Sequence, residues 1–185
     1  GLSVMMWQVI LGLNLGWFVH GVVIDALNMI VPNAFSAVVS VTVLLLIRRE
    51  RRLNPLTLFL VSGLVAAVMV AADLLLGSTG FGVLALLGSL IANTGQAIKL
   101  VHSPDISGVS PGYLLAQLVN QVLWLAWARL VEDSGTLIST VSTGLIVLFS
   151  SVWWLMRRFG LRPLFVQTAA AEVVPGETAQ VVCES

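Results

Sequence analysis

The sequence predicts an all-α integral membrane protein built from two parallel three-helix-bundle repeats joined by a linker helix. Two observations predict this fold class. Apolar residues make up 58% of the 185 positions and charged residues only 10%, whereas a soluble globular domain has roughly 25% charged residues. The chain also matches itself without a gap when it is shifted by 107 positions, and a duplicated membrane unit is the usual architecture of a carrier.

Equivalent positions in the two copies hold identical or similar residues. The shift pairs Trp17 with Trp124, and Asp25 with Glu132. Two similar halves of this kind are expected to rock about one central site that lies between them.

Six apolar segments are each close to the ~20 residues that cross the hydrocarbon core of a bilayer. They are residues 4–26, 28–47, 55–77, 80–101, 111–131 and 136–156. Arginines follow the second and sixth segments and Lys99 closes the fourth, so these three ends are predicted to be cytoplasmic. The segments that hold Trp17 and Trp124 then cross in the same direction, because segment 55–77 acts as an extra connecting helix between the copies.

These segments divide the chain into four parts. The parts are a first repeat with only its second and third helices (1–52), a linker transmembrane helix (53–79), a three-helix second repeat (80–158) and a disordered cytoplasmic tail (159–185). The second copy has a helix upstream of Ser110 that the first copy lacks upstream of Ser3. One helix is therefore expected to be missing from a seven-helix protein of a cell membrane, bacterial in type.

Composition and motifs argue against several kinds of chemistry. Net charge is zero and the basic residues lie at helix ends, so no nucleic-acid surface is expected. The single cysteine, Cys183, lies in the tail and cannot form an intrachain disulfide or a zinc or iron–sulfur site. The sequence has no Gly-rich phosphate loop and no nucleophile elbow. Neither an enzyme nor a cofactor is predicted.

Aromatic and polar residues at matching positions of the two copies predict a central substrate site. Asn33 follows Trp17 by 16 residues, and Thr140 follows Trp124 by the same distance. A tight turn between antiparallel helices brings both members of each pair to a similar depth. Tryptophan can stack on the apolar face of a sugar ring, and an amide offers both a donor and an acceptor. The alternative for each residue alone is packing between helices, but recurrence at equal spacing favours a site.

Other polar residues are candidates for the pathway or its gates. His20 lies one turn from Trp17 and is a candidate to line the pathway, with an ordinary packed histidine as the alternative. Gln117, Asn120 and Gln121 lie close to Trp124, and at least one of them, Gln121 among the candidates, is expected to face the cavity. An ion-pair gate at the outer helix ends is conceivable, with simple solvated helix ends as the alternative. Its members would be Asp25, Arg129 and Asp133.

Residues within or next to the apolar segments are candidates for two further functions, proton coupling and hinge bending. Asp73 lies about one turn inside the outer end of the linker helix and is a candidate for proton coupling. Gly95, Gln96 and Pro111 are candidate hinge residues, because glycine and proline weaken a helix where it must bend. The alternative for Gly95 is a close contact between helices.

The stretch from Gly95 to Ser110 resembles the PQ-loop signature of the SWEET and SemiSWEET sugar carriers. It has Gln96 after a glycine in the place of the signature proline, Lys99 three residues on, a polar loop, and a serine that opens the next helix. The sequences Leu-Trp-Leu-Ala-Trp-Ala at 123–128 and Gly-Trp-Phe-Val-His-Gly at 16–21 are similar to that family's Leu-Trp-x-x-Tyr-Gly. The resemblance covers nearly all of residues 1–156.

The resemblance implies a facilitator that moves a small sugar down its gradient by alternating access, without a cofactor. It places the substrate tryptophans at Trp17 and Trp124 and one substrate asparagine at Asn33, with Thr140 in the position of the second. The first alternative is a proton-coupled carrier of amino acids or other metabolites within the PQ-loop group, in which Asp73 or Asp25 would matter. A non-transporting receptor or scaffold on the same fold is the second. The expected partners are a small solute and the lipid bilayer, and the oligomeric state, a homo-oligomer included, stays open.

Overall fold

The computed structural model describes residues 4–103, 105–106, 108–162 and 164, and this part of the chain is entirely helical apart from its connections. The helices are α1 Val4–Val23, α2 Leu27–Arg51, α3 Pro55–His102, α4 Pro111–Leu130 and α5 Ser134–Arg158. The predicted all-α class is therefore confirmed for the described residues. Most of the predicted tail, including Cys183, lies outside them.

The helices have the length and apolarity of an integral membrane protein. Among the described residues, α1, α2, α3 and α5 are each long and apolar enough to cross a bilayer. Large apolar side chains on α2, such as Leu27 and Phe35, are about 70% exposed, which suits contact with lipid. The continuous helix α4 has the length of a span but is not among these four, and its sequence contains the polar residues Gln117, Asn120 and Gln121.

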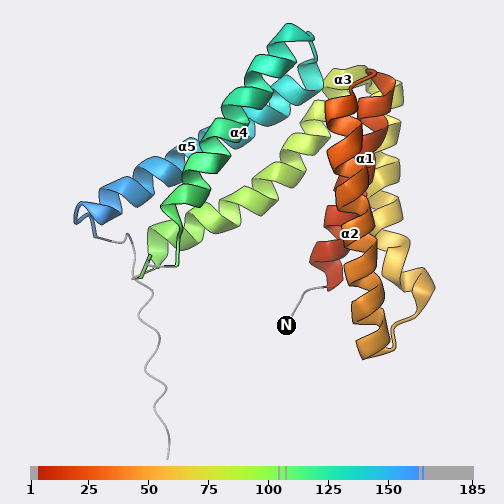
Figure 1. Cartoon of the computed structure of the whole chain (residues 1–185), viewed down its shortest axis with the longest axis horizontal. Coiled ribbons are helices and arrows are strands. Elements are labelled where there is room, and N and C mark those ends of the chain that lie inside the picture. The colour runs from red at the N-terminus through yellow and green to blue at the C-terminus, as the bar shows by residue number, and fades with distance from the viewer. Residues whose placement is uncertain (1–3, 104, 107, 163, 165–185) are drawn as a thin grey trace, which may run out of the picture.

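Two of the predicted segments, 55–77 and 80–101, belong to one 48-residue helical stretch, α3, that is broken at a single residue. Gly77 has φ 69° and ψ −172°, a region of backbone space that is essentially open only to glycine. Residues 55–76 lie alongside α1, and residues 78–102 run with α5 in a different direction (Figure 1). A one-residue break at Gly77 thus separates the two predicted segments.

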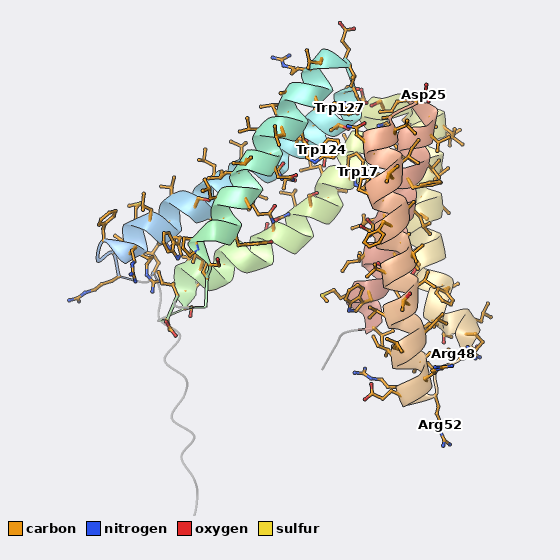
Figure 2. The ribbon with its side chains drawn as sticks, viewed as in Figure 1. Trp17, Asp25, Arg48, Arg52, Trp124 and Trp127 are labelled. Carbon is orange, nitrogen blue, oxygen red and sulfur yellow. The ribbon has the colours of Figure 1, made fainter. Side chains whose placement is uncertain are left out.

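The helices form two bundles that meet near Gly77 and diverge from there (Figure 1). The first bundle has α1 between α2 and residues 55–76, and the second has α5 between α4 and residues 78–102. Figure 2 shows Arg48 and Arg52 at the diverging end of the first bundle and Asp25 at its other end. We refer to these as the arginine end and the turn end.

Small residues bring the helices of each bundle close together. A Cβ added at Gly12 of α1 would lie 2.7 Å from Val65 of α3, and one added at Gly82 would lie 2.7 Å from the backbone of Gly135 in α5. Gln8 adds a polar contact between α1 and α3, because its Nε2 donates to the carbonyl oxygen of Leu58 at 2.7 Å. Such close backbone approaches are typical of helix pairs in membranes.

The helix pair α1–α2 recurs as α4–α5 at the spacing of the internal sequence match. Both ends of α4 and of α5 lie 107 residues after the corresponding ends of α1 and α2. The turn residues Asp25 and Glu132 also correspond, with φ of 54° and 57°. The packing of the third helix differs, since it lies on α1 in the first bundle and on α5 in the second.

Candidate functional site

A cavity of about 240 Å³ lies between the two bundles and is lined by side chains from all five helices. We call it the central cavity. Its lining consists of Trp17, Met29, Asn33, Ser89, Asn120, Gln121, Trp124, Thr136, Ser139, Thr140 and Thr143. All four predicted substrate residues are in this set, as is Gln121. Figure 2 shows Trp17 and Trp124 near the junction of the bundles.

The two tryptophans of the central cavity are each held by a second aromatic side chain. The ring of Trp17 meets Phe81 edge to face at 4.7 Å between centroids, and Trp124 meets Trp127 in the same way at 5.5 Å. Such pairs add about 0.5–1.5 kcal/mol beyond their burial. The tryptophan faces are thereby fixed in orientation on the two sides of the cavity.

Hydroxyl and amide groups make up most of the remaining lining, and none of these described side chains is charged. Asn33 Nδ2 donates to the carbonyl oxygen of Met29 at 2.7 Å, which orients the amide on its helix. Thr136 Oγ1 is buried without a hydrogen-bond partner among the described residues, and a buried unpaired hydroxyl favours a bound water or ligand. The cavity therefore suits a neutral polar solute.

The volume of the central cavity, about 240 Å³, is comparable to the lower end of the ~300–1,000 Å³ typical of small-molecule sites. The cavity is therefore large enough for a small solute.

Three ionisable side chains meet outside the central cavity, at the turn end. His20 of α1 is fully buried and lies between two carboxylates, with Nδ1 2.9 Å from Oδ2 of Asp73 and Nε2 3.3 Å from Oδ2 of Asp133. The imidazole also stacks on Phe81 at 4.1 Å between ring centroids. Among the side-chain hydrogen bonds of the described residues, the one between His20 and Asp133 joins the two bundles, and the packing of Phe81 on Trp17 and His20 adds an aromatic contact beside it. We call these three residues the His20 cluster.

Asp133 is held in place by the helix that it caps. Its carboxylate accepts hydrogen bonds from the backbone N–H groups of Gly135 and Thr136 at the start of α5, and Ser78 Oγ also donates to it. Burial alone would raise the pKa of Asp133, but hydrogen bonds from His20, Ser78 and Thr136 outweigh burial and lower that pKa below its ordinary value. Asp133 is therefore an anion at neutral pH.

The lowered pKa of Asp133 predicts acid sensitivity. A carboxyl group whose pKa is lower in the folded state contributes stability that is present above its ordinary pKa and lost as pH falls. We expect the melting temperature in detergent to fall as pH decreases below ~4, the ordinary value for aspartate. In Asp133→Asn the melting temperature should be lower at neutral pH and should vary less over that acid range. An equal acid response in the variant would contradict this account.

A second pocket, of about 440 Å³, lies at the turn end and is lined by residues of both helix turns. Asp25, Glu132, Trp127, Ser78 and Asp133 are among its lining. We call it the turn-end pocket. Because Asp133 lines this pocket and Thr136 lines the central cavity, the first turn of α5 separates the two.

The ion pair considered between Arg129 and Asp133 is not present among the described residues. Asp133 is 6% exposed and bonds to His20 instead, whereas Arg129 and Asp25 are exposed. The carboxylate of Asp133 caps the start of α5, which directs it into the protein. For Arg129 and Asp25 the alternative of solvated helix ends describes the structure better.

The candidate hinge residues lie away from the one observed break. α3 remains helical through Gly95, which has no neighbour within 4 Å of an added Cβ, so the alternative of a close helix contact there is not seen either. Pro111 occupies the first turn of α4 after the capping residue Ser110, where proline is compatible with a straight helix. The side chain of Gln96 lies outside the described part of the structure. The break is at Gly77 instead.

Sequence reasoning considered His20, Asp73 and Asp133 separately but missed that they form one cluster. It also missed Phe81, which contacts both Trp17 and His20. The feature of the sequence that could have indicated this cluster is that its three ionisable residues lie at similar distances from the predicted outer ends of their helices. No protein-family model matches the chain, and no match was found among curated proteins or solved structures. The function is therefore argued from the geometry.

Proposed function

We propose that the chain is a membrane transporter that moves a small sugar down its gradient through the central cavity. The observation that carries this proposal is the convergence of Trp17, Asn33, Trp124 and Thr140 on that cavity. Two aromatic faces and an uncharged set of hydroxyl and amide groups match a sugar ring, which has apolar faces and polar edges. No cofactor is needed for this activity.

The arrangement of the bundles supports a mechanism of alternating access. The bundles diverge toward the arginine end and are joined at the turn end by the His20 cluster (Figure 1). Arginines at Arg48 and Arg52 favour a cytoplasmic location for the diverging end. We infer that this conformation faces the cytoplasm and that a reversed conformation opens at the turn end.

The internal repeat supports the same proposal. Two helix pairs related by a shift of 107 residues would form corresponding halves around the cavity, parallel to each other and joined through residues 55–76. With the resemblance of the stretch from Gly95 to Ser110 to the PQ-loop signature, we infer a relationship to the SWEET carriers. His20 and Trp127 stand where that family has tyrosine, so the turn end is expected to work differently.

A proton-coupled carrier of the wider PQ-loop group is the second candidate. One observation favours it: Asp73 is buried against His20, as a proton-exchanging group within a membrane helix would be. Asp25, the other carboxylate considered for this function, is exposed in a turn. A buried acidic residue alone does not require coupling, and the uncharged central cavity favours a sugar.

Uptake into proteoliposomes tests the two candidates together. The purified chain would be reconstituted and given labelled glucose, xylose, sucrose and several amino acids, with and without an inward proton gradient. We expect saturable uptake of a monosaccharide, faster than that of sucrose, that stops when the internal and external concentrations are equal. Accumulation of an amino acid above the external concentration, driven by the gradient, would favour the coupled carrier. Uptake no faster than in empty liposomes for every solute would contradict both.

A further inference from the structure

We propose that His20, Asp73 and Asp133 form a proton-binding site, and that the proton bound there holds the two bundles together at the turn end. None of the three residues lines the central cavity. The inference deepens the proposed function, because it assigns to the transporter the group that controls opening at one end. Its tests below do not depend on the identity of the solute.

The geometry of the His20 cluster requires one more proton than a neutral imidazole between two ionised carboxylates carries. Both imidazole nitrogens face carboxylate oxygens, Nδ1 at 2.9 Å and Nε2 at 3.3 Å. A neutral imidazole has one N–H group and one lone pair, and an ionised carboxylate can only accept. Two hydrogen bonds therefore need an additional proton in the cluster. Imidazole is the most basic of the three groups, so His20 carries it.

Among the described residues, no other cationic side chain is placed to replace this proton. The side chains of His20, Asp73 and Asp133 are 0%, 2% and 3% exposed. The helix α2, which packs on α1, has no charged residue before its arginine end, and the single charged residue of α4, Arg129, is exposed. The other charged groups at the turn end, Asp25 and Glu132, are acidic. Without the proton, two buried carboxylates would lack a positive partner, which is strongly unfavourable.

Loss of the proton acts on the contact between the bundles. A neutral imidazole keeps one N–H group, which we assign to the shorter contact with Asp73 in the same bundle. Its Nε2 lone pair then faces the carboxylate of Asp133, so attraction becomes repulsion. Asp133 retains its donors from Ser78 and Thr136 and stays with α5. The proton passes to water in the turn-end pocket, and no other bond is made or broken.

Because of where His20 meets Asp133, the bound proton can control access from the turn-end pocket to the central cavity. Asp133 lines the turn-end pocket, and three residues later Thr136 lines the central cavity. Separation of His20 from Asp133 would move the first turn of α5 away from α1 and connect the pocket with the cavity. A bound proton thus closes this path and its release opens the path.

A distance measured across the turn end tests the proposal. In a Cys183→Ser background, Val22→Cys in α1 and Leu130→Cys in α4 would carry spin labels, since both positions are exposed and line neither cavity. The protein would be studied in lipid nanodiscs at about pH 5 and about pH 9, on either side of the ordinary histidine transition. We expect the label distance to be longer at the higher pH, by more than the ~2 Å of a local helix shift. An equal distance at both pH values would overturn the proposal.

Two histidine variants connect the movement to the cluster. His20→Gln cannot gain or lose the proton, so its label distance should not change with pH. His102→Gln replaces the other of the two histidines and should keep the full pH response. A pH response that persists in His20→Gln would overturn the proposal.

The protonation state can also be read directly, which keeps the test valid if His20→Gln fails to fold. In His102→Gln the remaining histidine signals in a ¹⁵N NMR spectrum belong to His20. We expect both ring nitrogens to be protonated at about pH 5 and one of them at about pH 9, with the change parallel to the label distance. A singly protonated ring at the lower pH would contradict the assignment. Both readouts remain informative if no solute is transported, so failure of the proposed function would be recognised separately.

Discussion

Replacement of Asn33 or Trp124 by alanine is expected to reduce solute uptake by at least about tenfold while the protein remains folded. A tenfold loss corresponds to ~1.4 kcal/mol, which is within the range for a lost hydrogen bond that leaves a polar partner unpaired. Trp124→Ala removes one of the two aromatic faces of the central cavity, and Asn33→Ala removes an amide whose Nδ2 is already oriented by the Met29 carbonyl. Initial uptake rates in proteoliposomes would measure both effects.

The chain offers a matched control for each of these variants. Asn14 makes the same bond to the backbone four residues earlier, from Nδ2 to the carbonyl oxygen of Ile10 at 2.8 Å, but does not line the cavity. Trp154 is partly buried near the other end of α5 and does not line it either. Asn14→Ala and Trp154→Ala should transport at close to the normal rate. Near-normal uptake by Asn33→Ala or Trp124→Ala would remove the central-site proposal.

Gly82→Ala is expected to destabilise the second bundle by about 1–3 kcal/mol, the usual cost of overpacking a closely packed contact. A Cβ at this position would lie 2.7 Å from both Cα and the carbonyl oxygen of Gly135. Backbone atoms cannot move aside as a flexible side chain can, so the helices must separate. Reversible unfolding in mixed micelles, or the melting temperature in detergent, would measure the loss.

Gly95→Ala is the control for this stability prediction, because Gly95 lies in the same half of α3 with no atom within 4 Å of an added Cβ. Alanine is favoured over glycine in a helix by up to ~1 kcal/mol, so this variant should be as stable as the parent or slightly more stable. If Gly82→Ala were equally stable, α3 and α5 could not be packed as closely as the structure has them.

The sequence predicted helices well where apolarity changes sharply at their ends. The segment expected at 28–47 continues in the structure to Arg51, because arginine is a good helix former whose long side chain can reach water from a helix end. Near Gly77 the sequence indicated only the boundary between segments 55–77 and 80–101. A pattern of hydrophobic residues does not reveal that the helix axis changes direction at a single glycine.

The central cavity was more predictable than the His20 cluster. Trp17 with Asn33 and Trp124 with Thr140 recur at equal spacing, and a repeated pattern indicates which residues share a depth and a face. His20, Asp73 and Asp133 have no such pattern, because the shift that pairs the two copies places Trp127 opposite His20. These three residues meet only because residues 55–76 pack on α1 and the start of α5 lies beside that helix pair. This arrangement is a property of the tertiary fold.

The break at Gly77 also limits how the two halves of the molecule can move. It is the single place where the backbone passes from the first bundle to the second, and it leaves helical geometry at one residue. Helices on both sides resist bending, so the covalent connection has two soft torsions, φ and ψ of Gly77. Relative motion of the bundles is therefore a swing with very few degrees of freedom. The contact between His20 and Asp133 lies at the same end of the molecule, beside the packing of Phe81 on Trp17 and His20, and can then select between the extremes of this swing.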